Sequence, residues 1–285
     1  MEARRRSSLP WIVPSHQAPA LALKYWKPRL FSGFGLVLGS LAPDLEFILR
    51  LDGQWFVSHT LLGQLTFTVP MVLVLYTLSV DLVVPWILRY VPSGPPLHFD
   101  ALSSLRRPRG REWLTVAASG LVGGLTHIFL DGFTHQDRSG WAVARIPLLR
   151  AHVPLLNAPL FEALQGGLTI GLGISALALW SHMVRERERG EGRPVPFVPR
   201  ASGRAKGELL RWLAGCVAAG VTLALGFRAQ TSFGLAVERG AYGALTFMAF
   251  GLVMGALADR LVRPSTTRGI GFAPPVSRGG EASAP

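Results

Sequence analysis

The sequence predicts an all-α fold, a polytopic transmembrane helix bundle of about six spans. Three observations lead to this prediction. The chain of 285 residues is 49% hydrophobic and only 16% charged. Its long apolar runs reach the ~20 residues that a helix needs to cross a bilayer. Its basic residues, which give a formal net charge of +12, cluster between these runs as juxtamembrane charges do, so the charge indicates a membrane protein with no nucleic-acid partner.

Each apolar run is long enough for one span. The predicted spans are residues 29–49, 60–88, 112–132, 155–181, 208–228 and 240–262. The first is the weakest: Gly35 and Gly39 stand four residues apart and would allow a close helix contact, and Pro43 is expected to end it. Ahead of this span, residues 15–26 are expected to form a short helix that turns back toward it, which would bring His16 to Asp44 at the outer end.

The spans divide the chain into five segments. These are an N-terminal segment (1–28), a four-span core (29–181), a flexible loop (182–207), two C-terminal spans (208–262) and a disordered tail (263–285). Arginine is concentrated in loops 89–111 and 182–207, so the positive-inside rule places both loops in the cytoplasm. The expected location is the cytoplasmic membrane, with membrane lipids as partners.

The third predicted span carries a polar stripe, "THIFLDGFTH", at the end that this topology places outside. His127, Asp131 and His135 are four residues apart, and each such step turns an α-helix by only ~40°, so the three side chains share one face. His59 begins the second span and Asp44 ends the first at the same depth. Ionisable side chains at membrane depth are costly, so the convergence favours a functional site over a helix end that merely faces water.

The residue types in this stripe define the chemistry to expect. Imidazole and carboxylate groups without thiolates suit Zn²⁺, Mn²⁺ or Fe²⁺, so the expected cofactor is a divalent metal ion, with zinc first. The fourth span adds Glu162, which shares a helix face with Gln165 and Thr169. His135 and Glu162 are the candidates for a general base, because an attacking water needs a proton acceptor that is not committed to the metal.

Five motifs resemble those of a bacterial family of integral membrane proteins, domain of unknown function family 4184. They are "SHQAPA", "LGSLAPDLEF", "SHTLLG", "THIFLDGFTH" and "LQGG", spread over residues 15 to about 170. More distantly, the pattern is similar to the YdjM-type membrane proteins described as metal-dependent hydrolases. That second resemblance implies a set of metal ligands, namely His16, Asp44, His59, His127 and Asp131. The chain departs from it after the Pro-Asp motif, where only Glu46 follows, and this argues against a complete two-metal centre.

The first functional hypothesis is a membrane-bound metal-dependent hydrolase that acts at the outer membrane–water interface on a lipid-like or phosphoester substrate. The sequence has no Gly-x-Ser-x-Gly motif, which disfavours acyl chemistry through a serine nucleophile. The competing hypothesis is a transporter or assembly protein whose buried polar cluster relays protons or cations. A structural bundle with a polar outer rim is the third.

Overall fold

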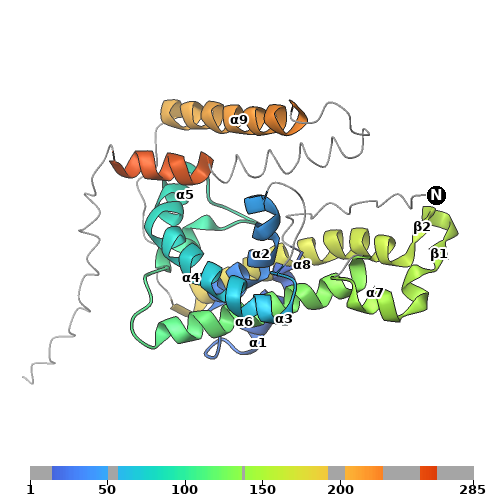
Figure 1. Ribbon diagram of the computed structural model, residues 1–285. Helices are drawn as coiled ribbons and strands as arrows, with labels where there is room; N and C mark the ends of the chain where they lie inside the picture. Colours follow the sequence, from blue (N-terminus) through green and yellow to red (C-terminus); the bar gives the residue numbers. More distant parts are fainter. Residues whose placement is uncertain (1–14, 51–56, 137–138, 192–202, 227–250, 262–285) are drawn as a thin grey trace, which may run out of the picture.

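The computed structural model describes residues 15–50, 57–136, 139–191, 203–226 and 251–261, and its architecture is helical (Figure 1). The α-helices are α1 (Gln17–Trp26), α2 (Gly33–Arg50), α3 (Leu61–Gly63), α4 (Val69–Leu78), α5 (Val84–Tyr90), α6 (Glu112–Thr134), α7 (Trp141–Arg145), α8 (Leu160–Glu191) and α9 (Gly203–Gly226). Residues 251–261 are helical as well. Short 3-10 turns cover Phe99–Ser104, Pro147–Arg150 and Pro154–Leu156. The strands β1 (His152–Val153) and β2 (Ala158–Pro159) pair as a small antiparallel hairpin.

Three helical stretches are long and apolar enough to cross a membrane. They are Leu61–Tyr90, Glu112–Thr134 and Leu160–Arg189, which correspond to the predicted second, third and fourth spans. The predicted number of six is not confirmed. The first predicted span is the 18-residue helix α2, whose second half contains Asp44 and Glu46. In α9 the apolar part shortens to Leu210–Ala219, and the predicted span 240–262 lies mostly outside the described residues.

The fourth predicted span is displaced along the chain relative to the prediction. Helix α8 begins at Leu160 rather than at residue 155, because Asn157 adopts a left-handed conformation (φ 47°) that turns the chain between β1 and β2. The helix also continues to Glu191, through the first part of the loop predicted at 182–207. That part alternates Arg and Glu, which are good helix formers, and His182 Nε2 lies 3.6 Å from Glu186 Oε1 one turn later.

The second span remains helical through two prolines because π-helical turns precede them. These turns cover Gln64–Thr68 and Ser79–Val83, just before Pro70 and Pro85. In each, a backbone N–H bonds to the carbonyl five residues earlier, from Val69 to Gln64 and from Val84 to Ser79. Gln64 and Thr68 are both fully buried, so the first π turn directs two polar side chains into the bundle.

Helices α1 and α2 form the N-terminal hairpin that the sequence predicts. Lys24 closes its turn by donating hydrogen bonds to the backbone carbonyls of Pro28 (2.5 Å) and Phe31 (2.8 Å). The predicted helix end at Pro43 is wrong, because α2 continues through this proline to Arg50. Packing against neighbouring helices allows a bundle to tolerate an internal proline. As a result, Asp44 lies within the helix, one turn after Ser40 and on the same face.

Glycines allow α2 and α6 to pack with their backbones in contact, as predicted for Gly35 and Gly39. A Cβ atom built on Gly39 would overlap the backbone of Gly120, and one built on Gly123 would overlap the carbonyl of Leu36. A Cβ on Gly35 would lie 3.0 Å from the carbonyl oxygen of Val116. Small residues at a crossing are the usual means by which membrane helices approach closely. This crossing determines which α2 atoms face the polar stripe of α6.

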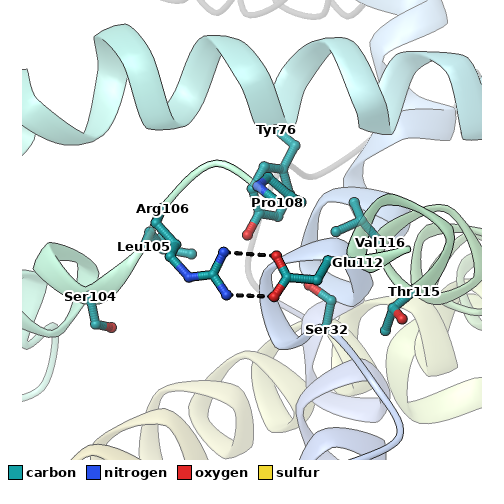
Figure 2. A pocket seen from close by; sticks show the side chains of 9 residues that line it. All are labelled: Ser32, Tyr76, Ser104, Leu105, Arg106, Pro108, Glu112, Thr115 and Val116. Carbon is teal, nitrogen blue, oxygen red and sulfur yellow. Dashed lines mark hydrogen bonds and ion pairs between the residues drawn. The ribbon is translucent and has the colours of Figure 1, made fainter. Parts of the chain in front are cut away.

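Two ion pairs lie near the start of α6, the end opposite its polar stripe. Arg106 donates two hydrogen bonds to Glu112, at 2.7 and 2.5 Å, and these bonds raise the pKa of the Arg106 guanidinium. Arg107 pairs with Asp81 in the same way. A pocket of about 250 Å³ lies beside the Arg106–Glu112 pair, bordered by the phenol of Tyr76 (Figure 2).

Candidate metal centre

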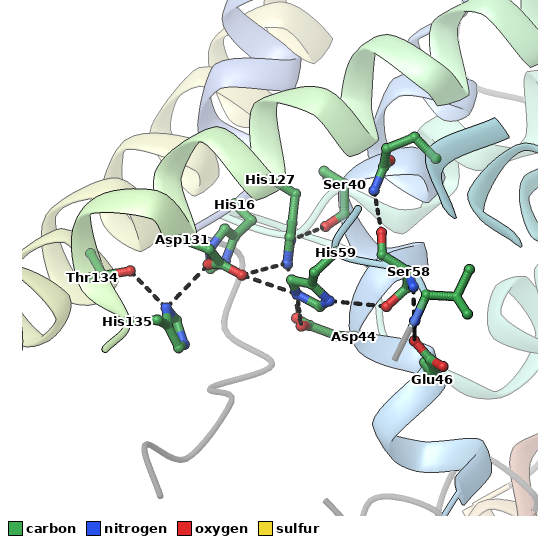
Figure 3. Close-up of polar contacts among 12 residues, drawn as sticks. His16, Ser40, Asp44, Glu46, Ser58, His59, His127, Asp131, Thr134 and His135 are labelled. Carbon is green, nitrogen blue, oxygen red and sulfur yellow. Dashed lines mark hydrogen bonds and ion pairs between the residues drawn. The ribbon is translucent and has the colours of Figure 1, made fainter. Parts of the chain in front are cut away.

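Asp131, near the end of α6, is the centre of a buried cluster of histidines (Figure 3). Its Oδ1 lies 3.0 Å from His16 Nε2, and its Oδ2 lies 3.1 Å from both His59 Nε2 and His127 Nε2. His135 approaches from the other side, with Nδ1 3.6 Å from Oδ1. Four imidazoles, from the start of α1, the end of α6 and the segment before α3, therefore surround one carboxylate that is 3% exposed.

A second carboxylate reaches the same centre from α2. Asp44 Oδ1 lies 3.4 Å from His127 Nε2 and 4.0 Å from His59 Nε2. The convergence of residues predicted from their shared depth is thus present in the structure. Two sets of three ligand atoms lie within 4.8 Å of one another: His16 with His127 and Asp131, and Asp44 with His59 and His127.

The ring of His127 indicates which kind of group this centre can hold. Its Nδ1 lies 2.8 Å from the backbone carbonyl of Ser40, which can only accept, so Nδ1 carries the hydrogen. In a neutral imidazole Nε2 then presents a lone pair to the oxygens of Asp44 and Asp131, which are acceptors too. Nε2 is fully buried and has no hydrogen-bond partner among the described residues. An electron-rich nitrogen facing two carboxylates fits a bound cation, and His/Asp donor sets suit divalent zinc.

Hydroxyl groups contact the rings of two other histidines. Ser58 Oγ lies 2.9 Å from His59 Nδ1, and Ser15 Oγ lies 3.4 Å from His16 Nδ1. In each pair the hydroxyl of the preceding residue contacts Nδ1 of the histidine. The Nε2 atom of the same ring then faces Asp131. The signal was present in the sequence, because His16, His59, His127 and His135 each follow a Ser or a Thr.

Ser58 is held in turn by two buried polar side chains. Its backbone N–H donates to Glu46 Oε2 at 2.9 Å, and its carbonyl accepts from Gln64 Nε2 at 2.5 Å. Glu46 therefore acts on the chain that carries His59. Because both groups are buried, we expect them to fix the position of the imidazole rather than to contact an ion themselves.

The two predicted bases occupy different surroundings. His135 turns its Nδ1 toward Asp131, whereas the other three histidines present Nε2. The hydroxyl of Thr134 donates to the carbonyl of Leu130, so it accepts from His135 Nδ1 at 3.0 Å and leaves Nε2 as the basic nitrogen. Glu162 lies half-buried in the first turn of α8, without a hydrogen bond or ion pair to the described residues of the cluster, and its role stays a prediction.

The chain matches, over residues 11–264, a family model described as "Domain of unknown function (DUF4184)". This range covers most of the chain and includes every residue of the cluster. Neither a curated protein nor a solved structure matches the chain.

Proposed function

We propose that this chain, which belongs to the DUF4184 family, is a membrane-bound metal-dependent hydrolase. Its substrate would be a lipid-like or phosphoester compound at the outer face of a bacterial cytoplasmic membrane. The observation that carries the proposal is the buried Nε2 of His127, which lies 3.4 Å from Asp44 Oδ1 and 3.1 Å from Asp131 Oδ2 and has no hydrogen-bond partner among the described residues. A divalent ion offsets the charge of the two carboxylates at a depth where ionised groups are costly.

Each residue of the cluster has a separate role in this scheme. The ligands would be His16, Asp44, His59, His127 and Asp131. When bound, zinc or a similar ion supplies Lewis acidity and lowers the pKa of a water molecule toward neutrality. His135 would accept the proton of the attacking water through Nε2, since its Nδ1 is occupied by Thr134. Glu162 is the second candidate for this step.

The competing function is a transporter or assembly protein whose cluster relays protons or cations. A relay across the membrane needs polar groups that continue through the bundle. Gln64 and Thr68 extend the polar region by two helical turns beyond His59. Beyond them the buried side chain of Val72 packs against Gly120, within a core cluster that also contains Leu38. Within the described residues the cluster is thus closed on this side, which supports a one-sided site.

Metal analysis of the protein purified in detergent tests the proposal. We expect wild type to retain zinc or another divalent ion and the double variant His127→Ala/Asp131→Ala to lose it. Activity is then measured on phosphoester substrates with and without a chelator. If wild type binds no divalent ion, the hydrolase proposal is wrong and the proton relay replaces it.

We predict different effects for the two histidines that flank Asp131 on α6. His127→Ala removes a buried ligand and should abolish metal retention, because the two carboxylates then lack their shared nitrogen partner. His135→Ala should retain the metal but lose activity, because only the proton acceptor is removed. Isothermal titration with Zn²⁺, together with turnover measurements, separates the two outcomes. Equal loss of metal in both variants would contradict the assignment of His135 as base.

We also predict that Ser58→Ala weakens metal affinity about 10-fold, the lower end of the range for residues that orient a ligand. The change removes the hydroxyl that meets His59 Nδ1 and leaves the bonds of the Ser58 backbone to Glu46 and Gln64 in place. Ser58→Thr keeps the hydroxyl and should restore affinity. Zn²⁺ titration measures both variants, and an unchanged affinity in Ser58→Ala would contradict a positioning role.

A further inference from the structure

The segment between α6 and α8 forms a small folded arm at the same end of the molecule as the Asp131 cluster (Figure 1). The arm is defined here as residues 139–159 and contains α7, β1 and β2. It is attached directly to the cluster-bearing helix. The indole of Trp141 packs against Gly132, where a Cβ atom would overlap it, and its ring lies 5.2 Å from that of Phe133. Gly132 is the residue after Asp131.

The arm buries some of its apolar side chains in a small core and exposes others to its surroundings. Val143 and Leu149 are buried with Phe161 of α8, at 1%, 7% and 4% exposure. Leu155 and Leu148, in contrast, are 92% and 67% exposed. Leu156 and Ile146 are exposed as well. A folded unit that buries one set of apolar side chains and turns another outward has an unpartnered apolar surface, which marks an interaction site.

The charges of the arm indicate what covers that surface. Arg145 and Arg150 are exposed, and the arm contains no acidic residue. Helices α6 and α8, which lead into and out of it, are both long and apolar enough to cross a membrane. Their exposed side chains, such as Phe129 and Ile170, continue the apolar surface along the spans. Apolar side chains bordered by arginines and an aromatic ring suit the boundary between acyl chains and anionic headgroups.

We propose that the arm lies in the bilayer interface, with Leu148, Leu155 and Leu156 among the acyl chains and Arg145 and Arg150 at the phosphates of anionic lipids. The surface is thus a lipid-binding surface. The arm starts beside Asp131, with Trp141 against Gly132, so its lipid contacts are at the end of the molecule that holds the cluster. For the substrate, the inference rests on the proposed function and narrows it to a phosphoester whose apolar tail stays in the membrane.

Fluorescence depth measurements test the position of the arm without reference to catalysis. An environment-sensitive dye is attached to Leu155→Cys, in a Cys216→Ser background, and the protein is reconstituted in phosphatidylcholine/phosphatidylglycerol vesicles. We expect a blue-shifted emission that nitroxides on the acyl chains quench. The matched control is Arg109→Cys, in the loop before α6, whose dye should emit as in water. Water-like emission at position 155 overturns the proposal. A blue shift without quenching by lipid nitroxides also overturns it, because a second copy or another protein then covers the arm.

A second measurement separates this inference from the hydrolase proposal. Leu148→Glu/Leu155→Glu should retain the metal, since neither leucine contacts the cluster. It should lose turnover of a vesicle-borne phosphoester but keep turnover of a short-chain soluble one. Loss of both activities with the metal retained would contradict the lipid-borne substrate. Absence of any activity in wild type would contradict the hydrolase proposal and leave the depth measurement valid.

Discussion

Asp131→Asn is expected to lower metal affinity by more than about 100-fold while the helical bundle remains folded. The carboxylate is the one group that all four histidines of the cluster approach, three of them at 3.0–3.1 Å. Asparagine keeps the shape of the side chain but removes its charge, so the imidazoles lose their shared anionic partner. Mass spectrometry of bound metal and circular dichroism on the same sample check both parts of the expectation.

The control for this substitution is Asp81→Asn. Asp81 is also a carboxylate on a membrane-length helix, but it pairs with Arg107 at the opposite end of the bundle from the cluster. We expect its loss to leave metal content unchanged, because Asp81 has no contact with the cluster among the described residues and its partner Arg107 is exposed. Full metal occupancy in Asp131→Asn would refute the metal centre. Unfolding of that variant would instead assign Asp131 a structural role.

Gly39→Val should have the second largest effect, on both stability and the site. A single Cβ at this position already overlaps the backbone of Gly120, so α2 and α6 must move apart. Overpacking costs about 1–3 kcal/mol where side chains can adjust, and here the opposing atoms are backbone. The separation also withdraws the Ser40 carbonyl from His127 Nδ1. We therefore expect a lower melting temperature in detergent together with weaker zinc binding.

Gly171→Ala is the matched control for that experiment. No atom of a neighbouring segment lies within 4 Å of a Cβ built on Gly171 in α8, so alanine should be accommodated there. Its helix propensity should leave stability unchanged or raise it by at most ~1 kcal/mol. Thermal unfolding of Gly39→Val and of Gly171→Ala is compared, with size-exclusion chromatography as the measure of the folded fraction. Equal melting temperatures for Gly39→Val and wild type would contradict the close crossing of α2 and α6.

Helical periodicity was sufficient to predict the stripe on α6. The spacing of His127, Asp131 and His135 defines one face of a helix whatever surrounds it. Equal depth then suggested Asp44 and His59 as neighbours of that face, and the structure places Asp44 beside His127 and His59 beside Asp131. For His16 the sequence predicted Asp44 as partner, and the structure pairs it with Asp131 at 3.0 Å. His16 is the N-cap of α1, and the direction of a side chain at a helix start is not determined by helical periodicity.

Contacts made by the backbone could not be predicted from the sequence. The partner of His127 Nδ1 is the carbonyl of Ser40, a group that every residue carries. Its position follows from the depth of the contact between Gly39 and Gly120 and from the continuation of α2 through Pro43. A proline suggests a helix end when it is considered alone, and only packing against a second helix reverses that expectation.

The 115 residues that separate His16 from Asp131 have a consequence for biosynthesis. His16, Asp44 and His59 are synthesised before α6, so their partners on α6 are made last. Insertion of α6 supplies Asp131 and His127 together and closes the cluster in one step. The cluster therefore depends on α6, the second of the three membrane-length helices, and a chain that ends before residue 127 cannot complete it.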